Sequence, residues 1–225
     1  MENPSKTGSA SSLLIFLIVM FVGILMMSNI LANHMIALGP FTIDAGTLTF
    51  PITYILSDVF SEVYGYKWSR RVAWYAMLMN ALMAGFIWLA IILPQPEWYD
   101  GSHFKLGVGG SYRIVIASLI SYQFGDFVND RIFRHFKEKH NGMRGFAFRA
   151  TLSSLGGQLV DTTLFVFIAF LFTMPSSQLF PMIIISVFLK WAYEITILPL
   201  TIKITKLVKK LEDREIKNGS IDNRG

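Results

Sequence analysis

Six long apolar stretches dominate the sequence and leave little choice of fold. Each holds about 20 residues, enough for a helix to cross a hydrocarbon core of about 30 Å at a rise of about 1.5 Å per residue. In lipid, the backbone N–H and C=O groups must be satisfied within each segment, and at this length only a helix does so. The stretches are residues 13–32, 47–66, 72–93, 111–130, 151–173 and 181–202.

The composition supports the same fold class. Hydrophobic residues make up 53% of the chain, charged residues only 16%, and the mean hydropathy is +0.49, outside the range of ordinary soluble domains. The first stretch is longer than the apolar part of a secretory signal and five more follow it, so we expect it to be retained. The sequence predicts an all-α polytopic membrane protein with six transmembrane helices in residues 13–208, an N-terminal tail (1–12) and a polar C-terminal tail (209–225).

The basic residues predict the orientation of this bundle. Seventeen of the 20 Lys and Arg fall on one side of the predicted spans, in the two tails and in the connections that follow the second and fourth spans. By the positive-inside rule, both termini are cytoplasmic. This topology accounts for the net charge of +5, so we expect contact with membrane lipids and none with nucleic acid. The basic, aromatic run at residues 131–140 could touch RNA or anionic lipid, but a cytoplasmic flank explains it more simply.

Several functional classes lack their sequence signals. The chain has no Cys, and its four His residues show no metal-binding spacing. It also lacks the glycine-rich loop with Lys by which many ATPases hold phosphates. We therefore expect no catalytic residue, no metal, no cofactor and no enzymatic activity.

Ionisable side chains inside the apolar stretches point to the functional region. Such a group costs about 2.5–3.5 kcal/mol at the centre of a membrane helix, so it normally faces a watered cavity lined by protein. In the second span, polar residues recur every three or four positions and form one stripe that is expected to line a cavity. In the fourth span Gln123 and Asp126 share a face, and in the fifth Gln158 and Asp161 do. The stripe of the second span comprises Thr53, Tyr54, Ser57, Asp58, Ser61 and Glu62.

A charged residue in the last span needs a partner. A salt bridge between Lys190 and one of the intramembrane acids would lower the cost of burying both. The remaining acids would be protonated, pair with a cationic substrate or face water. Carboxylates, carboxamides and aromatic rings together suit a flat heterocycle with a donor-rich edge, such as a guanine-like ring.

Over nearly its whole length the chain resembles the queuosine precursor transporter family, also called the vitamin uptake transporter family. The most specific likeness is Phe50-Pro51-x-Thr53-Tyr54-x-x-x-Asp58-Val-x-x-Glu62-Val-Tyr64-Gly65-Tyr66-Lys67, followed by Arg70-Arg71. Supporting pieces are Ser28-Asn29, Gln123-x-x-Asp126, Gln158-Leu-Val-Asp161-Thr162 and Lys190.

The resemblance implies six membrane helices and import of cyano- or aminomethyl-deazaguanine precursors of the queuosine tRNA modification. Carried onto matching positions, it implies a substrate-binding set that we complete with Tyr54 and Glu62 of the polar stripe. The candidate set is Asn29, Tyr54, Asp58, Glu62, Gln123, Asp126, Gln158, Asp161 and Lys190.

Three hypotheses follow for function. The first is a secondary transporter in the bacterial inner membrane, multi-pass and compatible with a homo-oligomer, in which one carboxylate could carry a coupling proton. The second is the substrate-binding subunit of a vitamin importer of the energy-coupling-factor type, which needs an ATPase partner. The third, remote alternative is an intramembrane aspartyl protease with Asp126 and Asp161 as its dyad.

Overall fold

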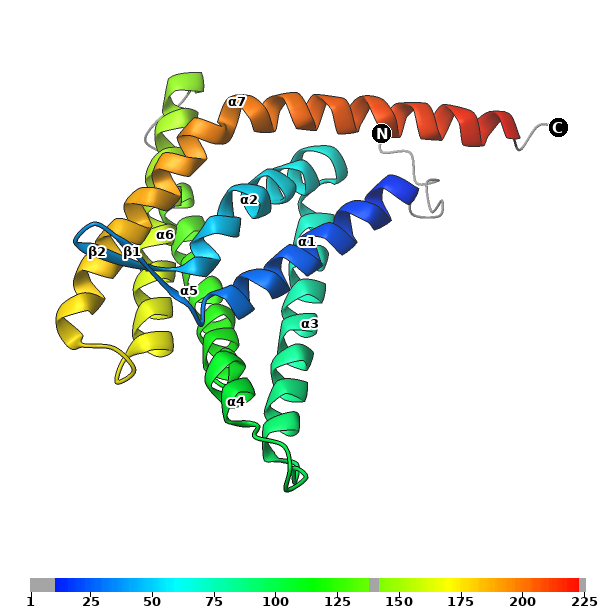
Figure 1. Ribbon diagram of the computed structural model, residues 1–225. Coiled ribbons are helices and arrows are strands. Elements are labelled where there is room, and N and C mark those ends of the chain that lie inside the picture. The colour runs from blue at the N-terminus through cyan, green and yellow to red at the C-terminus, as the bar shows by residue number, and fades with distance from the viewer. Residues whose placement is uncertain (1–10, 138–141, 223–225) are drawn as a thin grey trace.

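The computed structural model describes residues 11–137 and 142–222, and helices make up most of them (Figure 1). The all-α class predicted from the sequence is therefore confirmed. The helices are α1 (Ser12–Leu31), η1 (Ala45–Thr49), α2 (Phe50–Val59), η2 (Phe60–Tyr64), α3 (Tyr66–Ile92), α4 (Ser102–Val108), α5 (Ser111–Lys137), α6 (Gly142–Phe170) and α7 (Ser176–Asp222); the strands are β1 (Met35–Leu38) and β2 (Phe41–Asp44).

A short β-hairpin joins α1 to η1, and the sequence analysis does not predict it. Strands β1 and β2 pair antiparallel, from Met35 opposite Asp44 to Leu38 opposite Phe41. The turn between them contains Gly39, whose φ of +59° suits a residue without a side chain. The hairpin packs β2 against α7, so it brings the end of β2 into the helical bundle.

Helix α7 brings the C-terminal part of the chain into contact with its N-terminal part. It contains Pro181 and Pro199, and it bends in its middle so that its last turns run across α1 and α2 (Figure 1). There the buried carboxylate of Glu212 accepts hydrogen bonds from the hydroxyls of Ser11 and, at 2.5 Å, Tyr64. The start of α1 and the end of α7 thus lie at the same end of the molecule, and the predicted polar tail is helical as far as Asp222.

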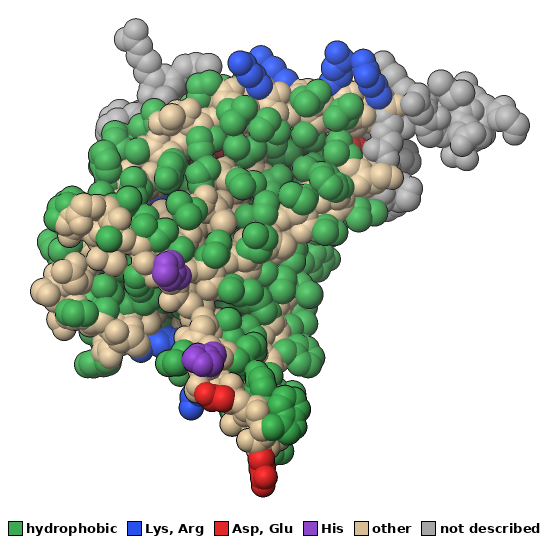
Figure 2. All heavy atoms as spheres, viewed as in Figure 1, with side chains coloured by type: hydrophobic (Ala, Val, Ile, Leu, Met, Phe, Trp, Pro, Cys, Tyr) green, Lys and Arg blue, Asp and Glu red, His purple; other side chains and the backbone are tan. Residues whose placement is uncertain are grey.

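Four helices of the described chain are long and apolar enough to cross a membrane: Ser12–Leu31, Lys67–Ile92, Leu152–Phe170 and Ser176–Arg214. The predicted spans 47–66 and 111–130 do not qualify, because α2 is short and α5 carries several polar and charged residues. Figure 2 shows an outer surface that is mainly hydrophobic, with charged side chains gathered near its two ends, as a bilayer requires. The count of six spans stays a prediction.

The predicted second span is not one uniform helix. It begins with the 3-10 turn η1, continues as α2, and ends in the π-helical turn η2. Gly65, at φ +85°, then lets the chain reverse into α3. A π turn adds a residue to the helical repeat, so side chains after Val59 no longer keep the α-helical phase of the polar stripe.

Two apolar clusters hold the bundle together. The first joins Ala32, directly after α1, to α5, α6 and α7 around Met182 and Val166. The second joins α1, α2, η2, α3 and α7 around Val59 and Phe60. Phe165 packs against the first cluster and Phe21 against the second. Because both rings also line one cavity, this cavity lies where the two clusters meet.

Helices α5 and α6 form the most extensive helix pair, and glycines allow their close approach. A Cβ added at Gly125 would lie 2.8 Å from the Asp161 Cβ and 3.0 Å from the Gly157 carbonyl oxygen. One added at Gly157 would lie 2.9 Å from the Gly125 carbonyl oxygen. At the other end of the pair, Arg113 of α5 donates to the carbonyls of Ile168, at 2.6 Å, and Leu171. This contact satisfies backbone acceptors at the end of α6.

Candidate functional site

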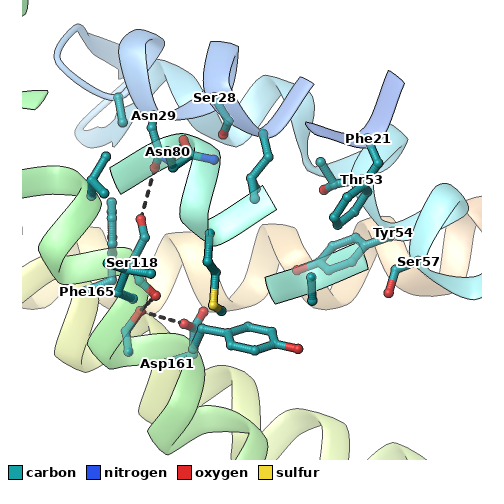
Figure 3. Close-up of a pocket in the computed structure, with 18 of the residues that line it drawn as sticks. Phe21, Ser28, Asn29, Thr53, Tyr54, Ser57, Asn80, Ser118, Asp161 and Phe165 are labelled. Carbon is teal, nitrogen blue, oxygen red and sulfur yellow. Dashed lines mark hydrogen bonds between the residues drawn. The ribbon is translucent and has the colours of Figure 1, made fainter. Parts of the chain in front are cut away.

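A cavity of about 240 Å³ lies inside the bundle (Figure 3). At about 30 Å³ per water molecule, it has room for about eight waters or one small ligand. We call it the central cavity. Its walls come from α1, β2, α2, α3, α5, α6 and α7, so residues far apart in the sequence meet there. Its polar lining residues are Ser28, Asn29, Asp44, Thr53, Tyr54, Ser57, Asn80, Ser118, Ser121, Tyr122, Asp161 and Lys190.

A buried ion pair occupies one wall of the central cavity. Lys190 Nζ lies 3.0 Å from Asp161 Oδ2, and it also donates to Thr162 Oγ1 at 3.0 Å. The other carboxylate oxygen, Asp161 Oδ1, accepts a hydrogen bond from Ser121 Oγ at 2.8 Å. The predicted salt bridge between Lys190 and an intramembrane acid is confirmed, with Asp161 as the partner. The hydroxyls of Thr162 and Ser121 reduce the cost of burying these charges.

A chain of carboxamides and a hydroxyl forms a second wall, seen at the upper left of Figure 3. Asn29 Nδ2 donates to Asn80 Oδ1 at 2.6 Å, and Ser118 Oγ donates to Asn29 Oδ1 at 3.0 Å. Asn80 in turn donates to the Ala76 carbonyl at 2.8 Å. Both asparagines are buried, so these bonds fix their amides in one orientation.

The hairpin contributes a carboxylate that the sequence analysis missed. Asp44, the last residue of β2, is only 4% exposed and lines the central cavity. Its Oδ2 accepts a hydrogen bond from Thr47 Oγ1 at 3.4 Å, at the long end of the usual range. The one available signal is an acid beside the apolar residues Ile43 and Ala45. It lies in a connection between predicted spans, so helical periodicity could not select it.

Gly46 allows the turn that carries Asp44 to lie against α1. A Cβ there would stand 2.7 Å from the Ser28 carbonyl oxygen and 2.8 Å from Asp44 Oδ1. We expect Gly46→Ala to push η1 away from α1 and to lower the unfolding free energy by about 1–3 kcal/mol. Thermal unfolding in detergent measures this loss. Gly23→Ala is the control, because a Cβ at Gly23 meets nothing within 4 Å; equal melting temperatures for the two variants would contradict the close contact.

Aromatic side chains border the polar groups. Phe21, Tyr54, Tyr122 and Phe165 all line the central cavity, and Figure 3 labels three of them, Phe21, Tyr54 and Phe165. Aromatic faces next to hydrogen-bonding groups suit a flat, polar ring, which can stack on the former and bond to the latter.

The structure brings four of the nine candidate binding residues to the central cavity and places five outside it. Asn29, Tyr54, Asp161 and Lys190 line it. The first part of the polar stripe lines it as well, through Thr53, Tyr54 and Ser57, whereas its last three members are exposed. The five candidates that lie outside its lining are Asp58, Glu62, Gln123, Asp126 and Gln158.

Two of these five belong to a second polar group, about one helical turn beyond the ion pair. Glu194 Oε2 accepts hydrogen bonds from Gln158 Nε2 at 2.7 Å and from Ser154 Oγ at 3.0 Å. Asp58 is exposed and lies within electrostatic range of Glu194. In the predicted orientation this group lies on the cytoplasmic side of the central cavity.

The other three candidates lie elsewhere. Gln123 is half-buried and donates weakly to the Met77 sulfur at 3.9 Å. Asp126 is half-buried on α5, one residue after the Gly125 contact with α6. Glu62 is exposed on the π-helical turn η2. The sequence analysis also missed Asn80, Ser118 and Ser121, since uncharged polar residues are common in membrane helices.

Comparison with known proteins identifies the relatives of this chain. It is 26% identical over 146 residues to the queuosine precursor transporter of Escherichia coli strain K12, and the matched region covers 64% of this chain and 62% of that protein. It is 25% identical over 128 residues to a probable queuosine precursor transporter of Haemophilus influenzae, covering 56% of this chain and 51% of the relative. A probable queuosine precursor transporter of Bacillus subtilis is 23% identical over 169 residues, which cover 74% of this chain and 73% of the relative.

The match therefore covers less than two thirds of the first two relatives. No solved structure matches the chain significantly. A family model described as putative vitamin uptake transporter matches residues 44–204, from Asp44 at the end of the hairpin to Ile204 in α7. This region includes Asp44, Asp161 and Lys190, and it makes up more than two thirds of the chain. The chain belongs to the vitamin uptake transporter family.

Proposed function

We propose that this protein is a six-span transporter that imports a queuosine precursor of the 7-deazaguanine type, such as preQ0 or preQ1, across the bacterial inner membrane. Both termini are cytoplasmic in this proposal, which agrees with the contact between Ser11 and Glu212 at one end of the molecule. The names of the relatives support the substrate class. The observation that carries the proposal is a cavity of ligand size in an apolar bundle, with charged and hydrogen-bonding side chains set among mainly apolar walls.

The lining residues suit a deazaguanine by their chemistry. The ring presents N–H and NH₂ donors on one edge, which a carboxylate such as Asp161 or Asp44 can accept. The ring carbonyl needs a donor, and Lys190 or a carboxamide supplies one. The faces of Tyr54, Tyr122 and Phe165 can cover the ring. Binding inside the membrane region, at a site formed by several helices, is typical of transporters.

Uptake by the purified protein tests this function. The protein in liposomes is expected to accumulate labelled preQ0 or preQ1, whereas empty liposomes and liposomes with a heat-unfolded sample are not. Uptake without any ATPase would support a secondary transporter. Binding of a deazaguanine without uptake would instead support the substrate-binding subunit of an energy-coupling-factor importer. Absence of both binding and uptake would contradict the proposed function.

A further inference from the structure

The central cavity contains more acidic than basic side chains. Its lining includes two carboxylates, Asp44 and Asp161, and one ammonium group, Lys190. Lys190 and Asp161 form an ion pair at 3.0 Å, and this pair is also bonded by Thr162 and Ser121. Lys190 also lies within electrostatic range of Asp44, so the two carboxylates of the described lining share one ammonium group.

The surroundings of Asp44 make such a charge costly. The residue is 4% exposed, and its carboxylate accepts hydrogen bonds from the Thr47 hydroxyl, at a long 3.4 Å, and from the backbone N–H groups of Asp44 and Thr47. A buried carboxylate remains costly where it shares one cation with a second carboxylate. A ligand that brings a positive charge next to Asp44 therefore gains binding free energy that a neutral ligand of the same shape does not.

We propose that the central cavity prefers a cationic ligand, and that Asp44 determines this preference by pairing with an ammonium group. The inference rests on the proposed function, and within the deazaguanine class it selects the precursor with an aminomethyl group over the one with a nitrile. A primary alkylamine is protonated near neutral pH, whereas a nitrile carries neither charge nor donor. The aromatic faces of Tyr54 and Tyr122 offer a cation further stabilisation.

The pairing requires that Asp161, and not Asp44, accepts the edge of the ring. The ring edge is the same in both precursors and carries no charge. With this assignment, the neutral precursor leaves the described lining with one carboxylate more than ammonium groups, and the aminomethyl precursor supplies the second ammonium group.

Competition for uptake into liposomes tests the preference. For the unchanged protein, the aminomethyl precursor is expected to compete at a concentration lower by about tenfold or more, the usual value of a charge-assisted hydrogen bond. Asp44→Asn should bring the ratio of the two competing concentrations close to one, because it weakens binding of the aminomethyl precursor and leaves binding of the cyano precursor unchanged. Asp44→Glu, which keeps the charge, should keep a preference. Asp213→Asn, an exposed position on α7, is the matched control and should leave the ratio unchanged.

Three results would overturn the inference while leaving the proposed function intact. The unchanged protein could take up both precursors equally well. Alternatively, Asp44→Asn could weaken binding of both precursors to the same extent, which would assign Asp44 to the ring edge that they share. The cyano precursor could also compete as well as the aminomethyl precursor once sodium is added, which would assign the charge to a metal cation. Thermal unfolding of each variant without ligand shows whether it folds. If Asp44→Asn does not, the ratios for the unchanged protein and Asp44→Glu decide.

Discussion

Lys190→Met is expected to reduce precursor uptake by about 100-fold or more and to lower the unfolding free energy by about 3–5 kcal/mol, because it leaves a buried carboxylate without its cation. The Lys190 side chain is 7% exposed and that of Asp161 29%, so water can replace only part of the lost interaction. Uptake into liposomes and thermal unfolding in detergent measure the two effects. Lys206→Met, at an exposed position farther along α7, is the control and should change neither.

The double variant Lys190→Met/Asp161→Asn separates stability from transport. Removing both charges eliminates the unpaired carboxylate, so the melting temperature should recover most of its loss. Uptake should stay low, because the cavity has lost a donor and an acceptor that we assign to the ligand. If the double variant transports as well as the unchanged protein, the ion pair serves only to hold α6 and α7 together.

Gly125→Ala is expected to lower the unfolding free energy by about 1–3 kcal/mol, the cost of overpacking a tight interior. The added methyl group would lie 2.8 Å from the Asp161 Cβ, which is fixed to the α6 backbone and cannot rotate away. Helices α5 and α6 must then separate, which moves Asp161 away from Ser121. We therefore expect a lower melting temperature together with weaker thermal stabilisation by added precursor.

Gly85→Ala provides the comparison for this variant. A Cβ at Gly85 meets nothing within 4 Å, and alanine favours a helix more than glycine does. This variant should melt at the same temperature as the unchanged protein or slightly above it. If Gly125→Ala melts at the temperature of Gly85→Ala, then α5 and α6 do not pack as closely as described.

The sequence predicted the helical class well, because long apolar stretches in lipid allow few alternatives. It also predicted that Lys190 pairs with an acid, since an isolated ammonium group is too costly inside a membrane. It could not choose Asp161 among the acids. Depth along a helix follows from residue number, but the direction in which a side chain points depends on how each helix rotates against its neighbours.

The same limit explains which candidate residues lie outside the central cavity. Periodicity places Ser57 and Asp58 in one polar stripe, but adjacent residues of a helix point about 100° apart. Of these two, Ser57 lines the cavity and Asp58 does not. The π-helical turn η2 then changes the direction in which the Glu62 side chain points relative to the stripe. Asp44 escaped notice for a different reason. It is placed by a β-hairpin, and hairpin packing against α7 is a tertiary property that no local pattern reveals.

The hairpin also limits where lipid can touch this protein. A two-stranded sheet has two outer edges, and their N–H and C=O groups find no partner within the sheet. Each such group would cost several kcal/mol against hydrocarbon tails. The turn side of the hairpin, from Leu38 to Phe41, is exposed in the monomer. Headgroups, water or a neighbouring protein surface must therefore surround this part of the chain, and acyl chains are kept away from the strand that ends in Asp44.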